Sequence, residues 1–284
     1  MSLLISCAAL LGILSSDPGA PVILDNGRVR LEVDPRVFGV RFAGFSGGPN
    51  FLDTVFPGEP QRPGAPGIDI GGFVADVLPR AGDPGPRRHA PAEIVEHDAR
   101  YVLLLGPEDP ETHWRVKKEF FLERDSATVR CRTALLTSRK VERSGGLRLT
   151  AQVARTGTVM LPRTEGEIGL YWGTFPGLAE LRRGPEDWAR IPVSGRGRDA
   201  RAVLVAPVTA MVMEAPFGRW TRRLESPEAG GGPGGRGRMF IVVDDRSHVC
   251  QVTLEVTGSG INAGAPLVVE EIWTFESEAG APRR

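Results

Sequence analysis

The chain has 284 residues, and its 35 Lys and Arg are balanced by 35 Asp and Glu, so its formal net charge is zero. Apolar residues make up 41% and charged residues 25%, which is ordinary for a globular protein whose length suffices for a sizeable core. Zero net charge argues against a general nucleic-acid binder, which needs a basic surplus to release counterions. The 36 Gly and 24 Pro are too many for a helix bundle or a coiled coil.

An apolar run extends from Leu3 to Leu14 at the amino terminus, interrupted only by Ser6. Because a bilayer-spanning helix needs about 20 residues, the run predicts no stable membrane span. Its length is typical of the apolar region of a secretory signal, so we expect residues 1–20 to be a signal peptide or N-terminal extension. The protein would then be periplasmic, extracellular or lipid-anchored through Cys7. The alternative is an N-terminal strand or helix packed on the domain of a cytoplasmic protein.

Apolar and polar residues alternate with a period of two over most of the chain, which indicates half-buried β-strands. The alternation is strongest in His113–Glu123 and in the run from Thr128 to Leu135, with turn residues between them, and these two runs predict a β-hairpin. The other predicted strands are Pro21–Leu24, Arg28–Val33, Val37–Phe45, Ala92–His97, Arg100–Gly106, Leu147–Ala154, Ile168–Gly173, Ala202–Ala206, Ala210–Ala215, Met239–Val243, Val249–Val256 and Leu267–Phe275.

Helical periodicity is limited to one or two turns at Leu178–Arg183 and Pro185–Ala189. Since no helix-length crossovers separate the strands, the pattern favours an all-β fold, a large antiparallel β-sandwich. We expect one domain over residues 21–277 and a disordered tail over 278–284. Two Gly- and Pro-rich stretches interrupt the strands: Pro57–Pro91 is interpreted as a surface excursion of this domain, and Ser226–Arg238 as a flexible hairpin tip.

Cys131 and Cys250 both lie on the apolar faces of predicted strands, which favours two buried thiols. A disulfide between them is the alternative if the protein is exported. The chain has no C-x-x-C pair and no His/Cys cluster, so the sequence predicts no metal site. It also has no dinucleotide or phosphate-binding loop in a strand-to-helix context, and we predict no cofactor.

Two charged residues share strand faces with apolar ones. Lys118 alternates in phase with Trp114 and Phe120, and Glu271 alternates in phase with Trp273 and its apolar neighbours. A charge on an apolar face needs a partner, because its burial alone is costly. One interpretation is a polar cleft in which a carboxylate acts as a base or binds a sugar hydroxyl. The other is a bulge that shifts the phase, or a structural ion pair.

The opening segment from Asp25 to Phe42, followed by Gly47–Leu52 and Gly71-Gly72, resembles the start of galactose-mutarotase-like β-supersandwich proteins. Within that superfamily it is most similar to a bacterial branch known as domain of unknown function DUF4380. The hairpin from His113 to Leu136 and the closing strand Val268–Phe275 also suit the fold. The resemblance covers residues 20–277, and it implies a sugar-binding fold.

Aldose mutarotases open and close the sugar ring with a histidine acid and a glutamate base, so the resemblance implies such a pair. The resemblance does not place this pair residue by residue, and His113 and Glu271 are the candidates that strand phase offers for the two catalytic roles. For substrate binding we predict Arg41 and Asp76 as hydroxyl partners, and Trp114 and Trp172 as stacking surfaces, with packing in the core as the alternative for both tryptophans. The chain departs from the family because Gly71–Pro79 lacks the His and Trp that relatives often carry there.

These observations predict a carbohydrate-binding, mutarotase-like protein whose partner is a sugar or glycan, with or without aldose epimerase-type activity. The alternatives are a non-catalytic structural or interaction module of the cell envelope, and an accessory domain of a polysaccharide lyase or hydrolase. The sequence leaves the identity of the sugar, the catalytic competence and the oligomeric state open.

Overall fold

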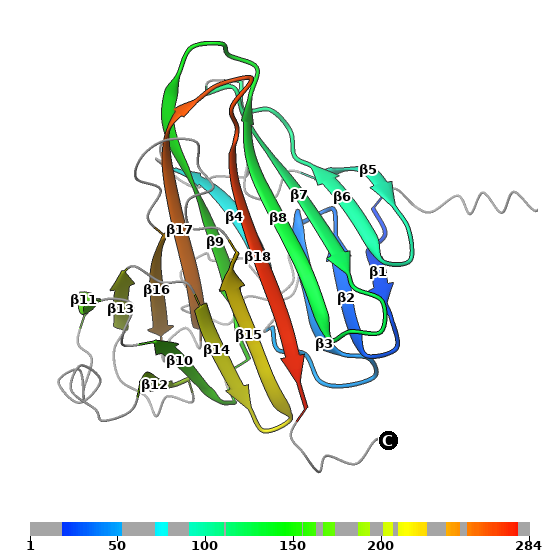
Figure 1. The fold of residues 1–284 in the computed structure, drawn as a ribbon, viewed down its shortest axis with the longest axis vertical. Coiled ribbons are helices and arrows are strands. Elements are labelled where there is room, and N and C mark those ends of the chain that lie inside the picture. Colours follow the sequence, from blue (N-terminus) through cyan, green and yellow to red (C-terminus); the bar gives the residue numbers. More distant parts are fainter. Residues whose placement is uncertain are drawn as a thin grey trace, which may run out of the picture.

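The computed structural model of the chain describes residues 19–52, 72–78, 91–110, 112–154, 156–162, 167–173, 187–193, 201–206, 210–225, 237–244 and 249–277. These residues form an all-β structure (Figure 1). Three predicted segments lie outside the described residues: residues 1–18 of the amino-terminal signal, the glycine-rich residues 226–236, and the tail 278–284. None of the described segments forms a helix long and apolar enough to cross a membrane.

The strands form two antiparallel nine-stranded sheets. Sheet 1 contains, in spatial order, β1 (Val22–Asp25), β2 (Val29–Asp34), β3 (Gly39–Phe45), β4 (Phe73–Leu78), β9 (Arg143–Gln152), β17 (Val249–Ile261), β16 (Gly237–Asp244), β13 (Arg201–Ala206) and β11 (Glu167–Gly173). Sheet 2 contains β12 (Trp188–Pro192), β10 (Thr158–Pro162), β14 (Ala210–Ala215), β15 (Gly218–Leu224), β18 (Leu267–Glu276), β8 (Thr128–Thr137), β7 (Trp114–Leu122), β6 (Tyr101–Leu105) and β5 (Glu93–His97). The predicted large antiparallel sandwich is confirmed.

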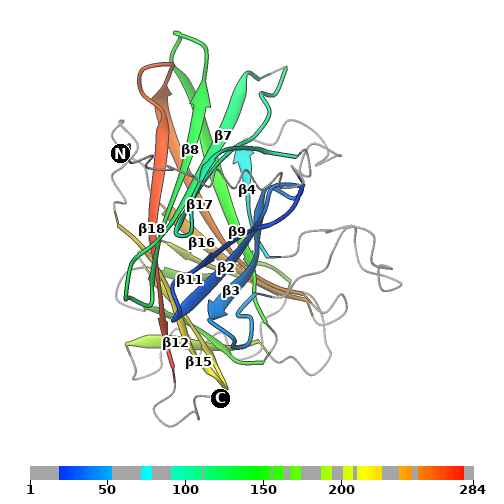
Figure 2. The same cartoon turned by 90° about the vertical axis from the view of Figure 1, so that its right-hand side faces the viewer.

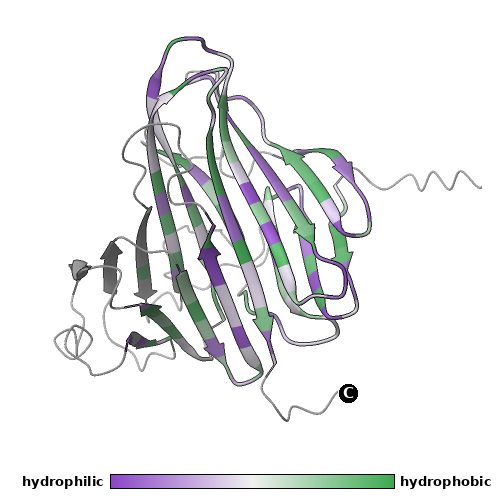
Figure 3. Ribbon diagram, in the orientation of Figure 1, coloured by the Kyte–Doolittle hydropathy of each residue, from purple (hydrophilic) through white to green (hydrophobic). Residues whose placement is uncertain are grey.

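The two sheets pack face to face, with β18, β8 and β7 in one layer and β17, β9 and β4 in the other (Figures 1 and 2). Each sheet turns the apolar set of its alternating residues toward the other sheet, and Figure 3 shows this alternation as bands along β7, β8 and β18. Aromatic rings join the layers: the ring centroids of Phe73 in sheet 1 and Trp273 in sheet 2 are 4.8 Å apart. Burial of these faces is the main stabilising contribution to a sandwich of this kind.

The predicted hairpin of β7 and β8 forms with the register Phe120 opposite Cys131. Cys131 lies in sheet 2 and Cys250 in sheet 1, and both are buried thiols that form no disulfide with each other. The interpretation as two buried apolar side chains is therefore the one that the structure supports.

Two predictions are corrected by the strand assignment. The stretch Pro57–Pro91 is not only a surface excursion, because β4 lies within it and pairs with β9 near the centre of sheet 1. The helical turn predicted for Pro185–Ala189 is wrong in its described part, where β12 begins at Trp188 and pairs with β10. In both places, pairing with a distant strand overrides the local sequence preference.

Candidate functional site

The outer face of sheet 1 carries a row of polar side chains over its central strands. On β9, Leu147, Leu149 and Ala151 point into the core, so Arg148, Thr150 and Gln152 point to the opposite face. The cross-strand partners of these three on β17 are Glu255, Thr253 and Gln251. β4 pairs with β9 on the side away from β17, and there Asp76 of β4 is the cross-strand partner of Arg148. We call these seven residues the polar strip: Asp76, Arg148, Thr150, Gln152, Gln251, Thr253 and Glu255.

Arg148 and Glu255 form an ion pair on the polar strip. The Arg148 Nε donates to Glu255 Oε1 at 2.6 Å, and its Nη2 lies 2.5 Å from the same oxygen. The two side chains are 29% and 16% exposed, so the pair is half-buried and accessible. Among the described residues, Oε2 of Glu255 and Nη1 of Arg148 have no hydrogen-bond partner. The pair thus presents an acceptor and a donor side by side.

Thr150, Thr253 and Gln152 are more deeply buried than this pair, whereas Asp76 and Gln251 are half-buried. The hydroxyls of Thr150 and Thr253 lie 3.1 Å apart and satisfy each other. Gln152 is only 1% exposed, and neither its Oε1 nor its Nε2 has a hydrogen-bond partner in the part of the chain that the structure describes. Its backbone is fixed, because its N–H donates to the carbonyl oxygen of Gly72 at 2.8 Å. The strip therefore ends in a buried carboxamide whose polar atoms are unsatisfied.

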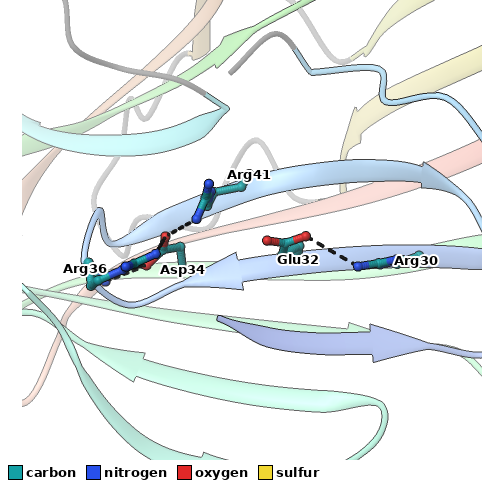
Figure 4. Close-up of polar contacts among 5 residues, drawn as sticks. All are labelled: Arg30, Glu32, Asp34, Arg36 and Arg41. Carbon is teal, nitrogen blue, oxygen red and sulfur yellow. Dashed lines mark hydrogen bonds and ion pairs between the residues drawn. The ribbon is translucent and has the colours of Figure 1, made fainter. Parts of the chain in front are cut away.

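A second polar cluster surrounds Asp34 at the end of the β2–β3 hairpin (Figure 4). The buried Asp34 carboxylate accepts hydrogen bonds from the Nε and Nη2 of Arg36 at 3.0 and 2.9 Å, and from the Nη1 of Arg41 at 2.9 Å. Burial alone would raise the pKa of Asp34, but the hydrogen bonds from Arg36 and Arg41 outweigh it and hold this pKa below its ordinary value. The register between β2 and β3 shifts at Glu32 and Val33, which leaves Arg41 as an extra residue and re-aims its side chain toward Asp34.

The structure places the predicted hydroxyl partners Arg41 and Asp76 on strands that are neighbours, since β3 pairs with β4 at Val40 and Phe73. Arg41 is bound to Asp34, whereas Asp76 belongs to the polar strip beside Arg148. Asp76 is also close enough to Lys118 that its negative charge acts on the Lys118 ammonium.

Glu271 lies between the sheets, where its Oε1 accepts hydrogen bonds from Nε and Nη2 of Arg222. It belongs to a row of inward-facing polar groups on four neighbouring strands of sheet 2, namely Lys118, Cys131, Glu271 and Arg222. Glu271 and Arg222 thus form a structural ion pair, which is one of the two interpretations that the sequence left open. The catalytic role of Glu271 stays a prediction.

His113 precedes β7 with a φ of 58°, in the left-handed region, at one end of sheet 2. Its Nδ1 is 2.8 Å from Oε1 of Glu108, and its Nε2 is 2.6 Å from Nη2 of Arg139. Glu271 is paired through Cys131 with Phe120, seven residues along β7 from His113, which corresponds to roughly 23 Å at about 3.3 Å per residue. The structure therefore does not bring His113 and Glu271 together in one cleft.

Of the two predicted stacking residues, Trp114 is buried in the core between the sheets, and the guanidinium of Arg143 lies 5.2 Å from its ring. Trp114 therefore packs in the core, which the sequence analysis gave as the alternative to stacking on a sugar. Trp172 lies on β11, at the edge of sheet 1, beside a β-bulge. Its side chain lies outside the described residues.

Sequence reasoning missed Arg148, Gln152 and Glu255, although it predicted the strands that carry them. Period-two alternation already gave these residues as the polar face of the runs Leu147–Ala154 and Val249–Val256. What it could not give is that β9 and β17, about a hundred residues apart in the chain, are neighbours in register. The ion pair follows from that pairing.

The outer face of sheet 2 has a shallow hollow of about 230 Å³, lined by Glu119, Phe121, Arg130, Arg132, Glu225 and Glu270 together with Cys131 and Glu271. Its exposed charges neutralise each other, as in the pairs of Arg132 with Glu119 and with Glu270. Such exposed ladders are typical of a solvated sheet face. Within the described ranges, no three His, Cys, Asp or Glu side chains converge as metal ligands would.

Comparison with known proteins gives matches in structure only. No family model matches the chain, and no curated protein is similar to it in sequence. A galactose mutarotase-like protein from Lactobacillus casei ATCC 334 aligns with a TM-score of 0.55 and 11% identity over 90% of this chain and 100% of its own. A protein assigned as an aldose 1-epimerase from Escherichia coli K12 aligns with a TM-score of 0.59 and 12% identity over 91% and 99%.

The Slr1438 protein from Synechocystis sp. PCC 6803 aligns with a TM-score of 0.60 and 11% identity, over 92% of this chain and 97% of its own. The likeness spans nearly the whole of each protein, while the identity is too low to carry residue roles across. Together with the two facing antiparallel sheets, these matches identify the architecture: the chain has the galactose-mutarotase-like β-sandwich fold.

Proposed function

We propose that this protein binds a carbohydrate on the polar strip of sheet 1, with Asp76, Arg148 and Glu255 as its hydrogen-bonding groups. The observation that carries the proposal is the Arg148–Glu255 pair, which presents a donor and an acceptor that no described residue satisfies. Adjacent sugar hydroxyls both donate and accept, so they match such a pair. Charge-assisted hydrogen bonds of this kind are the stronger ones in proteins.

The proposal moves the site away from the His113 and Glu271 pair. Among the described residues of the strip, the ionisable groups are carboxylates and an arginine, and an arginine does not give up its proton in proteins. Ring opening of an aldose needs a proton donor and a proton acceptor at the same sugar. We therefore propose recognition as the main function and epimerase-type turnover as a second candidate, supported by the names of the structural neighbours. We also propose that the protein belongs to the DUF4380 branch and that it is exported across a membrane.

Binding is tested by calorimetry and thermal shift with a panel of neutral aldoses and short oligosaccharides. We expect at least one sugar to bind, and Glu255→Gln to weaken that sugar at least tenfold, because it replaces an ionised acceptor by a neutral one. Glu270→Gln, on the outer face of sheet 2, is the matched control and should retain full affinity. If the wild-type protein binds none of the sugars, the function as a structural module of the cell envelope is favoured instead.

Turnover is tested separately, by measuring the rate at which the α and β anomers of the bound sugar interconvert. Acceleration by the wild-type protein that is lost in Asp76→Asn and Glu255→Gln supports the second candidate. An interconversion rate equal to that in buffer, with binding intact, leaves recognition as the function.

A further inference from the structure

The unsatisfied side chain of Gln152 distinguishes one end of the polar strip from the other. Both polar atoms of this carboxamide are buried without a hydrogen-bond partner among the described residues, whereas the Thr150 and Thr253 hydroxyls beside it bond to each other. A buried polar group without a partner destabilises the folded state, and an apolar side chain of similar size would avoid this cost. Gln152 is therefore better explained by a ligand than by the packing of the sheet.

The position of Gln152 places it at the buried end of the strip. Arg148 and Gln152 are four residues apart on β9, roughly 13 Å at about 3.3 Å per residue, and the exposed fraction falls from 29% for the Arg148 side chain to 1% for Gln152. The charges of the strip are gathered at the other end, where the carboxylates of Asp76 and Glu255 outnumber the single guanidinium of Arg148, so an anionic group of a ligand is disfavoured there as well. A ligand on the strip meets charged groups at the exposed end and a neutral amide at the buried end.

The chemistry of a carboxamide limits what it can bind there. It offers an acceptor oxygen and an NH₂ donor and carries no charge. A carboxylate or phosphate brought beside it would be buried without a counter-charge, which is strongly unfavourable. A pair of hydroxyls satisfies both amide atoms without introducing a charge.

We propose that Gln152 is a specificity-determining residue that binds the uncharged, hydroxyl-bearing end of the ligand, so that the strip selects neutral sugars over uronic acids and sugar phosphates. This inference rests on the proposed carbohydrate binding and names its substrate class. The residue acts by direct hydrogen bonding, and its removal changes affinity without lowering stability.

The experiment compares the wild-type protein with Gln152→Leu and Gln152→Asn. The probes are D-galactose with its charged counterpart galacturonate, D-glucose with its charged counterparts glucuronate and glucose 6-phosphate, and the neutral disaccharide lactose, which is long enough to reach from one end of the strip toward the other. For the wild-type protein we expect a neutral probe to bind at least tenfold more tightly than its charged counterpart. For Gln152→Leu we expect an unchanged or raised unfolding temperature and at least a tenfold loss of affinity for the neutral sugar. Gln152→Asn keeps the amide and should retain part of the affinity. It replaces the leucine variant in the comparison if that variant does not fold.

The failures are distinguishable. If Glu255→Gln loses the sugar while Gln152→Leu and Gln152→Asn bind it as the wild type does, the role of Gln152 is overturned and the proposed function stands. Equal or tighter binding of the uronic acids by the wild type overturns the neutral-sugar specificity. Absence of binding by the wild type to every probe overturns both proposals.

Discussion

The carboxylate of Glu271 accepts two hydrogen bonds from the guanidinium of Arg222, at 3.0 and 2.7 Å, in the layer between the two sheets. The side chains are 3% and 1% exposed, and the Arg222 guanidinium also lies 5.1 Å from the ring of Phe73 on the opposite sheet. Their strands β15 and β18 are neighbours in sheet 2. Each charge is held inside the sandwich by the other, because neither is solvated there.

This pair predicts a pronounced non-additivity. Arg222→Met or Glu271→Leu alone should lower the free energy of unfolding by about 3–5 kcal/mol, since each leaves one buried charge uncompensated. The double variant replaces both charges by apolar groups and should recover most of that loss. Urea unfolding of the four proteins measures the coupling. If the double variant is stable but has lost sugar binding, Glu271 belongs to the functional site after all.

Lys118 predicts a rise of stability with pH. Its side chain is fully buried, its Nζ donates to the carbonyl oxygen of Phe38, and burial lowers its pKa from 10.5 to about 7, opposed by the charge of Asp76. In the unfolded chain Lys118 keeps its proton up to about pH 10, so above pH 7 the unfolded state binds more protons than the folded state. Between pH 7 and 8 the free energy of unfolding should therefore increase, by at most about 1.4 kcal/mol per pH unit. Below pH 7 both states are protonated, and this contribution no longer changes.

The control for Lys118 is Lys118→Met, which removes the titrating group and keeps the length of the side chain. The difference in free energy of unfolding between the wild type and this variant should shift between pH 7 and 8 and stay constant between pH 5 and 6. A difference that does not vary between pH 7 and 8 would show that Lys118 retains an ordinary pKa in the folded protein.

Gly72 and Gly47 both have positive φ, at 82° and 72°, but their surroundings differ. A Cβ on Gly72 would lie 1.8 Å from the carbonyl oxygen of Val40, whereas a Cβ on Gly47 meets nothing within 4 Å. Gly47→Ala should thus cost only the strain of the left-handed backbone, about 1–2 kcal/mol. Gly72→Ala should cost clearly more, because β3 and β4 must also move apart. Thermal unfolding compares them, and equal losses would contradict the close approach of the two strands.

His113 gives a prediction about function. It contacts Glu108 and Arg139 at one end of sheet 2, away from the polar strip. His113→Ala should therefore leave sugar affinity within twofold of the wild type and change stability by no more than about 1 kcal/mol, as is usual for a partly exposed position outside the core. Calorimetry with the sugar that the wild type binds measures this. A loss comparable to that of Glu255→Gln would restore the histidine to the site.

Strands with clean alternation were predictable, and those without it were not. Trp114–Leu122 and Leu267–Glu276 present one apolar face and one polar face, so their type and orientation follow from the sequence. In β4 the short run Phe73–Leu78 is flanked by Gly and Pro and broken by Asp76, and it becomes a strand because β9 pairs with it. The strands β10, β12 and β15 were likewise missed, as each is recognised by its partners more than by its own pattern.

The sequence by itself determined the architecture and the identity of the misfit charges. Alternation of side chains along extended segments requires two facing apolar layers, and it already assigned Lys118 and Glu271 to the apolar faces. Only the tertiary structure decided which distant residues meet, namely Glu271 with Arg222 and Arg148 with Glu255, and that the Gln152 carboxamide finds no hydrogen-bond partner among the described residues. The reason is that strand order in an antiparallel sandwich is set by long-range pairing and by the packing of two whole sheets. Local periodicity fixes the face of each side chain but does not specify its neighbours.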